Sequence, residues 1–157
     1  NKGIFNIYKK YSNKLVGALK IEAGSVNGYN GKYQPLSSNF QLGGKKLRGF
    51  ESGKIGPKDG SDYIGGNYVS SINATTTLPV ILENVQSVDI VLFADAANIW
   101  GVDYDSSLDN SGIRSSIGIG LDWLTPVGPL TFSFAQPITK EPSDIEETFR
   151  FNIGTSF

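Results

Sequence analysis

One arginine in the sequence could make a specific ionic contact. Arg48 lies within a polar, glycine-rich segment of about forty residues, 26–66, and long loops of this kind are usually functional or disordered. Its planar guanidinium can donate two parallel hydrogen bonds to one carboxylate. Asp95 is the best partner, because it alternates with the apolar residues of its predicted strand; Asp122 is the runner-up. The residues alone also fit a solvated loop arginine, since most surface charges contribute little.

The neighbours of Arg48 indicate a loop that folds back on itself. Leu47, Gly49 and Phe50 complete the motif, and we expect Phe50 to be an apolar plug beneath the loop, with an exposed aromatic as the alternative. Gly43, Gly44 and Gly49 permit positive φ or close backbone approach, although simple loop flexibility explains them nearly as well.

Composition excludes several kinds of chemistry. The chain has no histidine and no cysteine, so the usual zinc sites, cysteine nucleophiles and Ser-His-Asp triads are excluded. A net charge of −1 gives no indication of nucleic-acid binding. We therefore expect no enzyme, no metal and no cofactor. The chain begins at Asn1 and contains no methionine, which predicts a processed product or part of a longer protein.

Alternation of apolar and polar residues with a period of two predicts an all-β chain. The expected strands cover residues 5–11, 15–24, 68–78, 89–100, 113–123, 130–135 and 149–157. Apolar runs fall far short of the ~20 residues that a transmembrane helix needs, whereas several strands have the roughly 9–11 residues of a membrane-spanning strand. Pattern alone fits either a soluble sandwich or an outer-membrane barrel, because each buries one face.

Three features favour the barrel. Aromatic residues lie near strand ends, at Trp100, Trp123, Phe149 and Phe157, as in an interfacial girdle. Short turns alternate with longer loops, and the last strand ends on an aromatic residue. Seven strands would leave two open edges in lipid, where each unpaired backbone group costs several kcal/mol. We therefore expect either part of a larger barrel or an assembly of chains.

Several separated motifs resemble the BamA family of outer-membrane protein assembly factors, in the family's order. They are residues 40–44 (Phe-Gln-Leu-Gly-Gly), 47–50 (Leu-Arg-Gly-Phe), 55–57 (Ile-Gly-Pro), 65–67 (Gly-Gly-Asn), 93–100, 113–130 and 149–157. The resemblance covers residues 15–157. It implies the last seven strands of a sixteen-stranded antiparallel transmembrane β-barrel, with residues 27–66 as a long external loop and without the family's periplasmic POTRA domains.

The resemblance also implies a function and a site. It implies assembly and insertion of β-barrel proteins in the outer membrane of Gram-negative bacteria, with lipid, unfolded barrel substrates and accessory lipoproteins as partners. It implies that Arg48 pairs with Asp95 in the lumen. Ala97 departs from the family's glycine, and Thr75 stands where an acidic residue is common.

The last strand resembles the carboxy-terminal signal of outer-membrane proteins. The residues that carry this likeness are Phe149, Phe151, Ile153, Gly154 and Phe157. In this picture the strand pairs weakly with the first strand of the barrel, which this sequence lacks, and the seam between them can open laterally. Gly154 would weaken the pairing locally, because it has no side chain to pack. The alternatives are a TamA-like factor or a two-partner secretion transporter of the same superfamily, and, from other classes, a passive porin or another outer-membrane barrel.

Overall fold

The computed structural model describes residues 1–157 with the exception of residues 13–14, 29–31, 34, 79–86, 127 and 155–157. Seven antiparallel strands form one sheet, in which every strand pairs with the next one along the sheet. They are β1 (Lys2–Ser12), β2 (Leu15–Ser25), β6 (Tyr68–Thr77), β7 (Val88–Trp100), β8 (Arg114–Thr125), β9 (Gly128–Thr139) and β11 (Phe149–Ile153). The seven strands predicted from alternation are confirmed.

Most strand boundaries lie within one or two residues of the prediction. The larger differences are that β1 begins at Lys2 rather than at residue 5, that β9 continues past residue 135 to Thr139, and that β11 ends at Ile153. Residues 155–157 of the predicted last strand lie outside the described residues. The pairing of β8 with β9 shifts between Ser115 and Ser116, which lie opposite Thr139 and Pro137. Proline cannot donate a ladder hydrogen bond, so it is tolerated at such an irregularity. The shift therefore lets β9 extend beyond the point where the sequence suggested that it ends.

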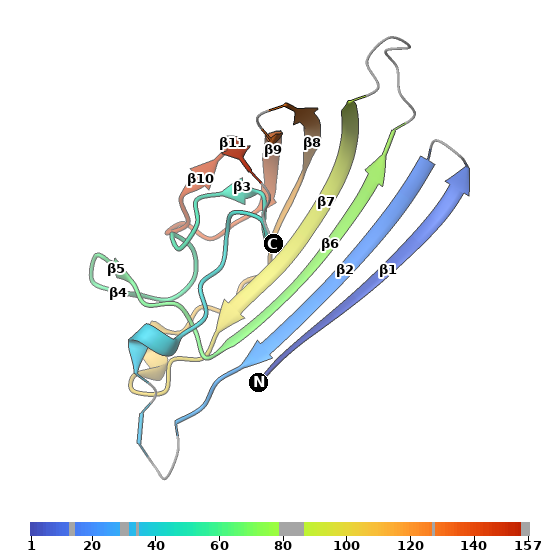
Figure 1. The fold of residues 1–157 in the computed structure, drawn as a ribbon. Helices are drawn as coiled ribbons and strands as arrows, with labels where there is room; N and C mark the ends of the chain where they lie inside the picture. The colour runs from blue at the N-terminus through green and yellow to red at the C-terminus, as the bar shows by residue number, and fades with distance from the viewer. Residues whose placement is uncertain (13–14, 29–31, 34, 79–86, 127, 155–157) are drawn as a thin grey trace.

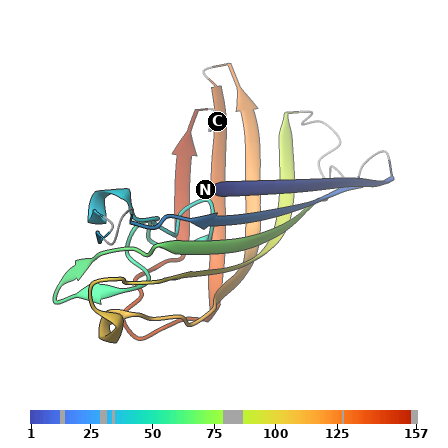
Figure 2. The ribbon, with the colours of Figure 1, turned by 90° about the horizontal axis from the view of Figure 1, so that it is seen from below.

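The sheet curves into an arc, and the long connection between β2 and β6 lies on its concave side (Figures 1 and 2). This connection contains η1 (Leu36–Ser38), β3 (Gly49–Phe50), β4 (Lys58–Asp59) and β5 (Asp62–Tyr63). A second short helix, η2 (Ser106–Leu108), follows β7, and β10 (Glu146–Glu147) pairs with β3. Within the described ranges, no helix is long and apolar enough to cross a membrane.

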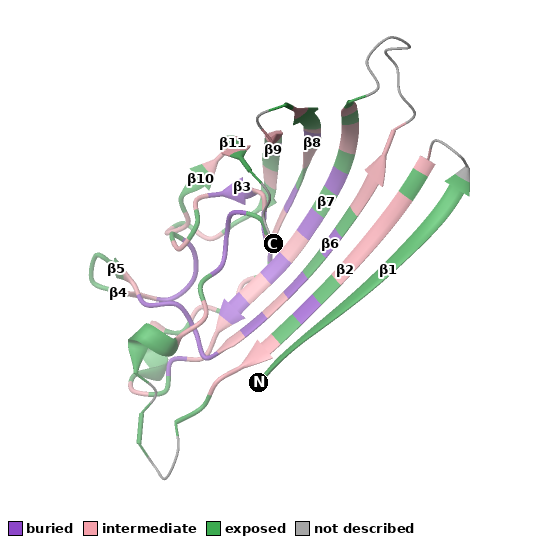
Figure 3. Cartoon of the chain, in the orientation of Figure 1, coloured by how far each residue is buried: buried purple, intermediate pink, exposed green. Residues whose placement is uncertain are grey.

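The two faces of the sheet differ in a way that separates a barrel from a sandwich. Large aliphatic and aromatic side chains are exposed along neighbouring strands, among them Ile72, Leu92, Ile117, Ile119 and Phe134. The alternate positions carry buried groups, many of them polar (Figure 3). A soluble sandwich would bury the aliphatic face, whereas a membrane barrel presents it to lipid and keeps polar groups in the lumen. The curved sheet is therefore part of an antiparallel transmembrane barrel.

The apolar core lies between the long connection and the concave face of the sheet. The connection contributes four buried side chains and the strands contribute three: Leu42, Leu47, Phe50, Ile55, Val69, Ala97 and Ile99. Fully burying a residue such as Leu or Phe contributes about 1.5–3 kcal/mol. The connection is therefore a packed layer of the molecule, and it carries Arg48 into the concavity.

Candidate functional site

The backbone around Arg48 runs very close to the strands. Gly43, Gly44 and Gly49 have φ values of 106°, 64° and 92°, a region that residues with a Cβ rarely adopt. At Gly49 a Cβ would lie 3.1 Å from the Cβ of Ala135 and 3.3 Å from that of Ser116. Glycine at this position therefore lets the loop backbone pack directly on β8 and β9.

Arg48 and Asp95 form a bidentate ion pair. Arg48 Nε donates to Asp95 Oδ2 at 2.7 Å, and Nη2 donates to Oδ1 at 2.7 Å. The backbone N–H of Arg48 donates to the same Oδ2 at 3.1 Å. The Asp95 carboxylate is fully buried, and the Arg48 side chain is 20% exposed. Three charge-assisted hydrogen bonds from one residue fix both the side chain and the backbone of the loop at this point.

Phe93 supports the guanidinium from beneath. The Arg48 Cζ lies 3.6 Å from the centroid of the Phe93 ring, a cation–π geometry. Phe93 and Asp95 share a face of β7, because strand side chains alternate. The residue opposite Phe93 on β8 is Gly118, where a Cβ would lie 2.4 Å from Phe93 Cζ. The absence of a side chain at Gly118 therefore leaves the space that the ring occupies.

The backbone carbonyls of Lys46 and Arg48 are also hydrogen-bonded to strands of the sheet. Asn73 Nδ2 donates to the carbonyl of Lys46 at 2.9 Å, and the Ser116 hydroxyl donates to the carbonyl of Arg48. Thr75, which stands where the resemblance expects an acidic residue, lies on the same strand as Asn73, β6. Asn73 lies opposite Asp95 in the β6–β7 register, whereas Thr75 lies opposite Phe93.

A second carboxylate, which was not predicted from the sequence, meets the same loop. Glu22 on β2 is 2% exposed, and its carboxylate lies 2.8 Å from Lys46 Nζ, 3.3 Å from Lys2 Nζ and 3.7 Å from Lys20 Nζ. The available signal was an acidic residue on the polar-face positions of its strand. Because the register of β2 and the path of the loop are long-range features, the lysines around Glu22 could not be identified from the sequence.

The other predicted site residues lie as follows. Leu47 and Phe50 are fully buried in the core beneath the loop. Asp122, the runner-up partner, accepts a hydrogen bond from the Thr131 hydroxyl at 2.8 Å, and Arg48 pairs with Asp95 instead.

The predicted terminal-strand signal lies mainly on β11. Phe149, Phe151 and Ile153 are exposed on the convex face. The rings of Phe149 and Phe151 pack on those of Phe134 and Phe132, with centroids 4.8 and 4.9 Å apart. Gly154 has a φ of 98°, and Phe157 lies outside the described residues.

Comparisons with known proteins agree with this arrangement. The model of the Omp85 superfamily domain matches residues 2–157. The chain is 34% identical, over 87% of its length, to the outer membrane protein assembly factor BamA of Neisseria meningitidis, and 29% identical, over 94%, to that of Neorickettsia risticii. It spans about a fifth of these curated relatives, 21% and 20%.

A solved structure extends the likeness to three dimensions. The crystal structure of BamA from Haemophilus ducreyi lacking POTRA domains 1–3 superposes with a TM-score of 0.88 at 30% identity. The match covers 96% of this chain and 33% of that one. The BamA-type resemblance predicted from the sequence motifs is confirmed, and the chain belongs to the Omp85 superfamily.

Proposed function

We propose that this chain is the substrate-handling part of a BamA-type barrel, which assembles and inserts β-barrel proteins in the outer membrane of Gram-negative bacteria. The observation that carries the proposal is the Arg48–Asp95 pair, with both partners on the concave face of a sheet whose convex face is aliphatic. Lipid, unfolded barrel proteins and accessory lipoproteins are the partners. The activity needs no cofactor and no covalent chemistry.

The anchored loop supports this function because it is held in a fixed position on the concave face of the sheet. Asp95 receives three hydrogen bonds from Arg48, and the Phe93 ring lies under the guanidinium. Hydrogen bonds to charged groups contribute about 1.5–3 kcal/mol each. A loop held in this way keeps a fixed relation to the strands while the membrane-facing edge exchanges partners.

The terminal strand supplies the edge where a substrate would dock. Among the described residues, β11 pairs with β9 over five residue pairs, whereas β8 and β9 pair over eleven. In the described part of the chain β11 is an end strand of the sheet. An exposed strand edge can accept an extended segment by β-augmentation, through main-chain hydrogen bonds. We propose that incoming strands are templated at this seam, which lowers the barrier to folding.

Reconstitution of the intact protein into phospholipid liposomes tests the proposal. An unfolded outer-membrane barrel protein is diluted from urea, and its folding is followed by heat-modifiable gel mobility. We expect folding to be faster than in empty liposomes and than in liposomes that contain an unrelated porin. Equal rates in all three preparations would reject assembly activity. Steady conductance in planar bilayers that does not depend on Arg48 would support a passive pore instead.

A further inference from the structure

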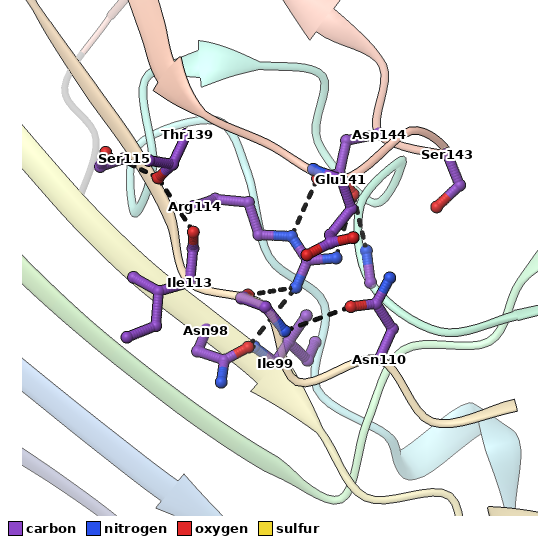
Figure 4. A network of polar contacts seen from close by, with 12 residues as sticks. Asn98, Ile99, Asn110, Ile113, Arg114, Ser115, Thr139, Glu141, Ser143 and Asp144 are labelled. Carbon is purple, nitrogen blue, oxygen red and sulfur yellow. Dashed lines mark hydrogen bonds and ion pairs between the residues drawn. The ribbon is translucent and has the colours of Figure 1, made fainter. Parts of the chain in front are cut away.

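The segment between β9 and β11 carries a buried ion pair that lies outside the anchor of Arg48. The side chains of Arg114, at the start of β8, and Asp144 are both fully buried. Arg114 Nε donates to Asp144 Oδ2 at 2.9 Å, and Nη2 donates to Oδ1 at 3.2 Å. Its Nη1 donates to the carbonyl of Gly112 at 2.6 Å and to Asn98 Oδ1 at 3.4 Å (Figure 4). The guanidinium therefore holds the segment in one orientation against β8.

The same carboxylate also holds the long loop. Asp144 Oδ1 accepts from the backbone N–H of Gly56 at 3.3 Å, and Oδ2 accepts from that of Glu141 at 2.8 Å. One buried side chain thus joins three parts of the chain that are distant in sequence: β8, the long loop and the segment before β11.

Backbone pairing continues the contact between the loop and this segment. β3 and β10 pair antiparallel, with Phe50 opposite Glu146 and Gly49 opposite Glu147. The N–H of Glu51 donates to the carbonyl of Ile145 at 2.9 Å, and the N–H of Ile145 donates to the carbonyl of Lys54 at 3.0 Å. The Tyr63 hydroxyl donates to the Ser143 carbonyl. The loop and residues 140–148 therefore form one hydrogen-bonded unit.

This unit connects the arginine anchor to the terminal strand over a short path. Arg48 directly precedes β3, and β10 ends two residues before β11 begins. Arg150 on β11 pairs back to Glu147, with Nη2–Oε2 at 2.8 Å. Its Nη1 also lies against the loop, since a Cβ at Gly44 would be 2.4 Å away. These contacts therefore form a continuous connection between β3 and the start of β11.

We propose that Arg114 and Asp144 are a positioning pair that couples the seating of the long loop to the placement of β11. With the pair intact, Arg48 bound to Asp95 keeps β3 and β10 aligned and sets where the edge of β11 lies. The partner affected is an extended strand of a substrate barrel at that edge. The docking of a substrate strand at the edge of β11 rests on the proposed function, whereas the coupling between the long loop and β11 does not depend on any substrate.

Hydrogen–deuterium exchange of the intact protein in detergent micelles tests the coupling. Asp144→Asn should speed exchange of the amides of residues 145–153 at least tenfold. Lys140→Gln is the matched control, because it removes an exposed ion pair with Glu146 from the same segment. Unchanged exchange in Asp144→Asn, or an equal effect in Lys140→Gln, would overturn the proposal.

A double variant separates positioning from simple core damage. Asp144→Asn leaves a buried guanidinium without its charge partner, which can disturb the fold by itself. Arg114→Met with Asp144→Leu removes both charges. It still deprives the N–H groups of Gly56 and Glu141 of their acceptor. If this double variant folds, we expect the amides of β11 to exchange as fast as they do in Asp144→Asn. Amide exchange in β11 as slow as in the wild type would contradict the proposal.

Release of the arginine anchor tests the direction of the coupling. Arg48→Gln should speed exchange at Gly49 and Phe50 and also across residues 146–152. Faster exchange confined to the long loop would overturn the coupling. No substrate enters these measurements, so a failure to accelerate folding in liposomes would reject the proposed function and leave this result standing.

Discussion

Asp95 on β7 and Glu22 on β2 are both buried on the concave face, and both meet cations from one stretch of the long loop. Asp95 meets a single arginine, whose two side-chain hydrogen bonds are both 2.7 Å and whose guanidinium lies over Phe93. Glu22 meets three lysine ammonium groups at 2.8–3.7 Å, and their side chains are 28–45% exposed.

The difference shows two uses of charge at one interface. A guanidinium is planar and pairs with a carboxylate in one orientation, so Arg48 fixes the direction of the loop. An ammonium group on a flexible stem is a point charge, so the lysines balance Glu22 without orienting the backbone. We therefore expect function to depend sharply on the first site and weakly on the second, and substitutions at each can break or sharpen this comparison.

The largest effect is expected from charge reversal at the arginine site. Arg48→Glu should abolish accelerated folding of a barrel substrate in liposomes, because it places a second carboxylate against buried Asp95. Breaking a buried pair costs about 3–5 kcal/mol, which urea titration of the intact protein would measure. Adding Asp95→Arg should restore part of both quantities. No restoration in a double variant that still folds would argue against a direct pair.

A smaller effect is expected from Arg48→Lys, which distinguishes the bidentate geometry of the guanidinium from its positive charge. Arg48→Lys keeps the positive charge but loses the bidentate geometry, and we expect a loss of about 1.5–3 kcal/mol in the free energy of unfolding. The matched change at the second site, Lys46→Arg, should stay within about 0.5 kcal/mol of wild type. Equal losses at the two positions, measured by the same urea titration, would remove the distinction between them.

Removing the second carboxylate should have a moderate effect. Glu22→Gln leaves three lysines close together without their counter-charge, and we expect a loss of about 1 kcal/mol, given their exposure to solvent. The loop should remain seated, because Asn73 still holds the Lys46 carbonyl at 2.9 Å. Added salt should partly reverse the loss, since it screens the repulsion between the lysines. A salt-independent collapse comparable to Arg48→Glu would instead make Glu22 an orienting residue.

The smallest effect is expected at Lys20, the most distant of the three lysines that surround Glu22. Its Nζ lies 3.7 Å from Glu22 Oε2, and the side chain is 44% exposed. Lys20→Gln should change the free energy of unfolding by less than about 0.5 kcal/mol, as is usual for exposed pairs. A markedly larger change would indicate that the three lysines act as one network, which a double variant with Lys2→Gln would then resolve.

The sequence by itself determined the strands, the two faces of the sheet and the family. Period-two alternation assigns each side chain to a face because successive strand residues point in opposite directions. It placed Asp95 with the polar residues and Leu92 with the apolar ones, and the motifs around Arg48 indicated the superfamily.

Only the tertiary structure decided which residues meet. Arg48 and Asp95 are 47 positions apart, and their contact depends on the path of the loop across the concave face. Register, set by hydrogen bonds between distant strands, put Asn73 rather than Thr75 opposite Asp95. Burial of Arg114 with Asp144 requires the long loop and the segment before β11 to close over them. Alternation fixes the direction of a side chain, whereas its neighbours are fixed only by packing and pairing of segments that are remote in the sequence.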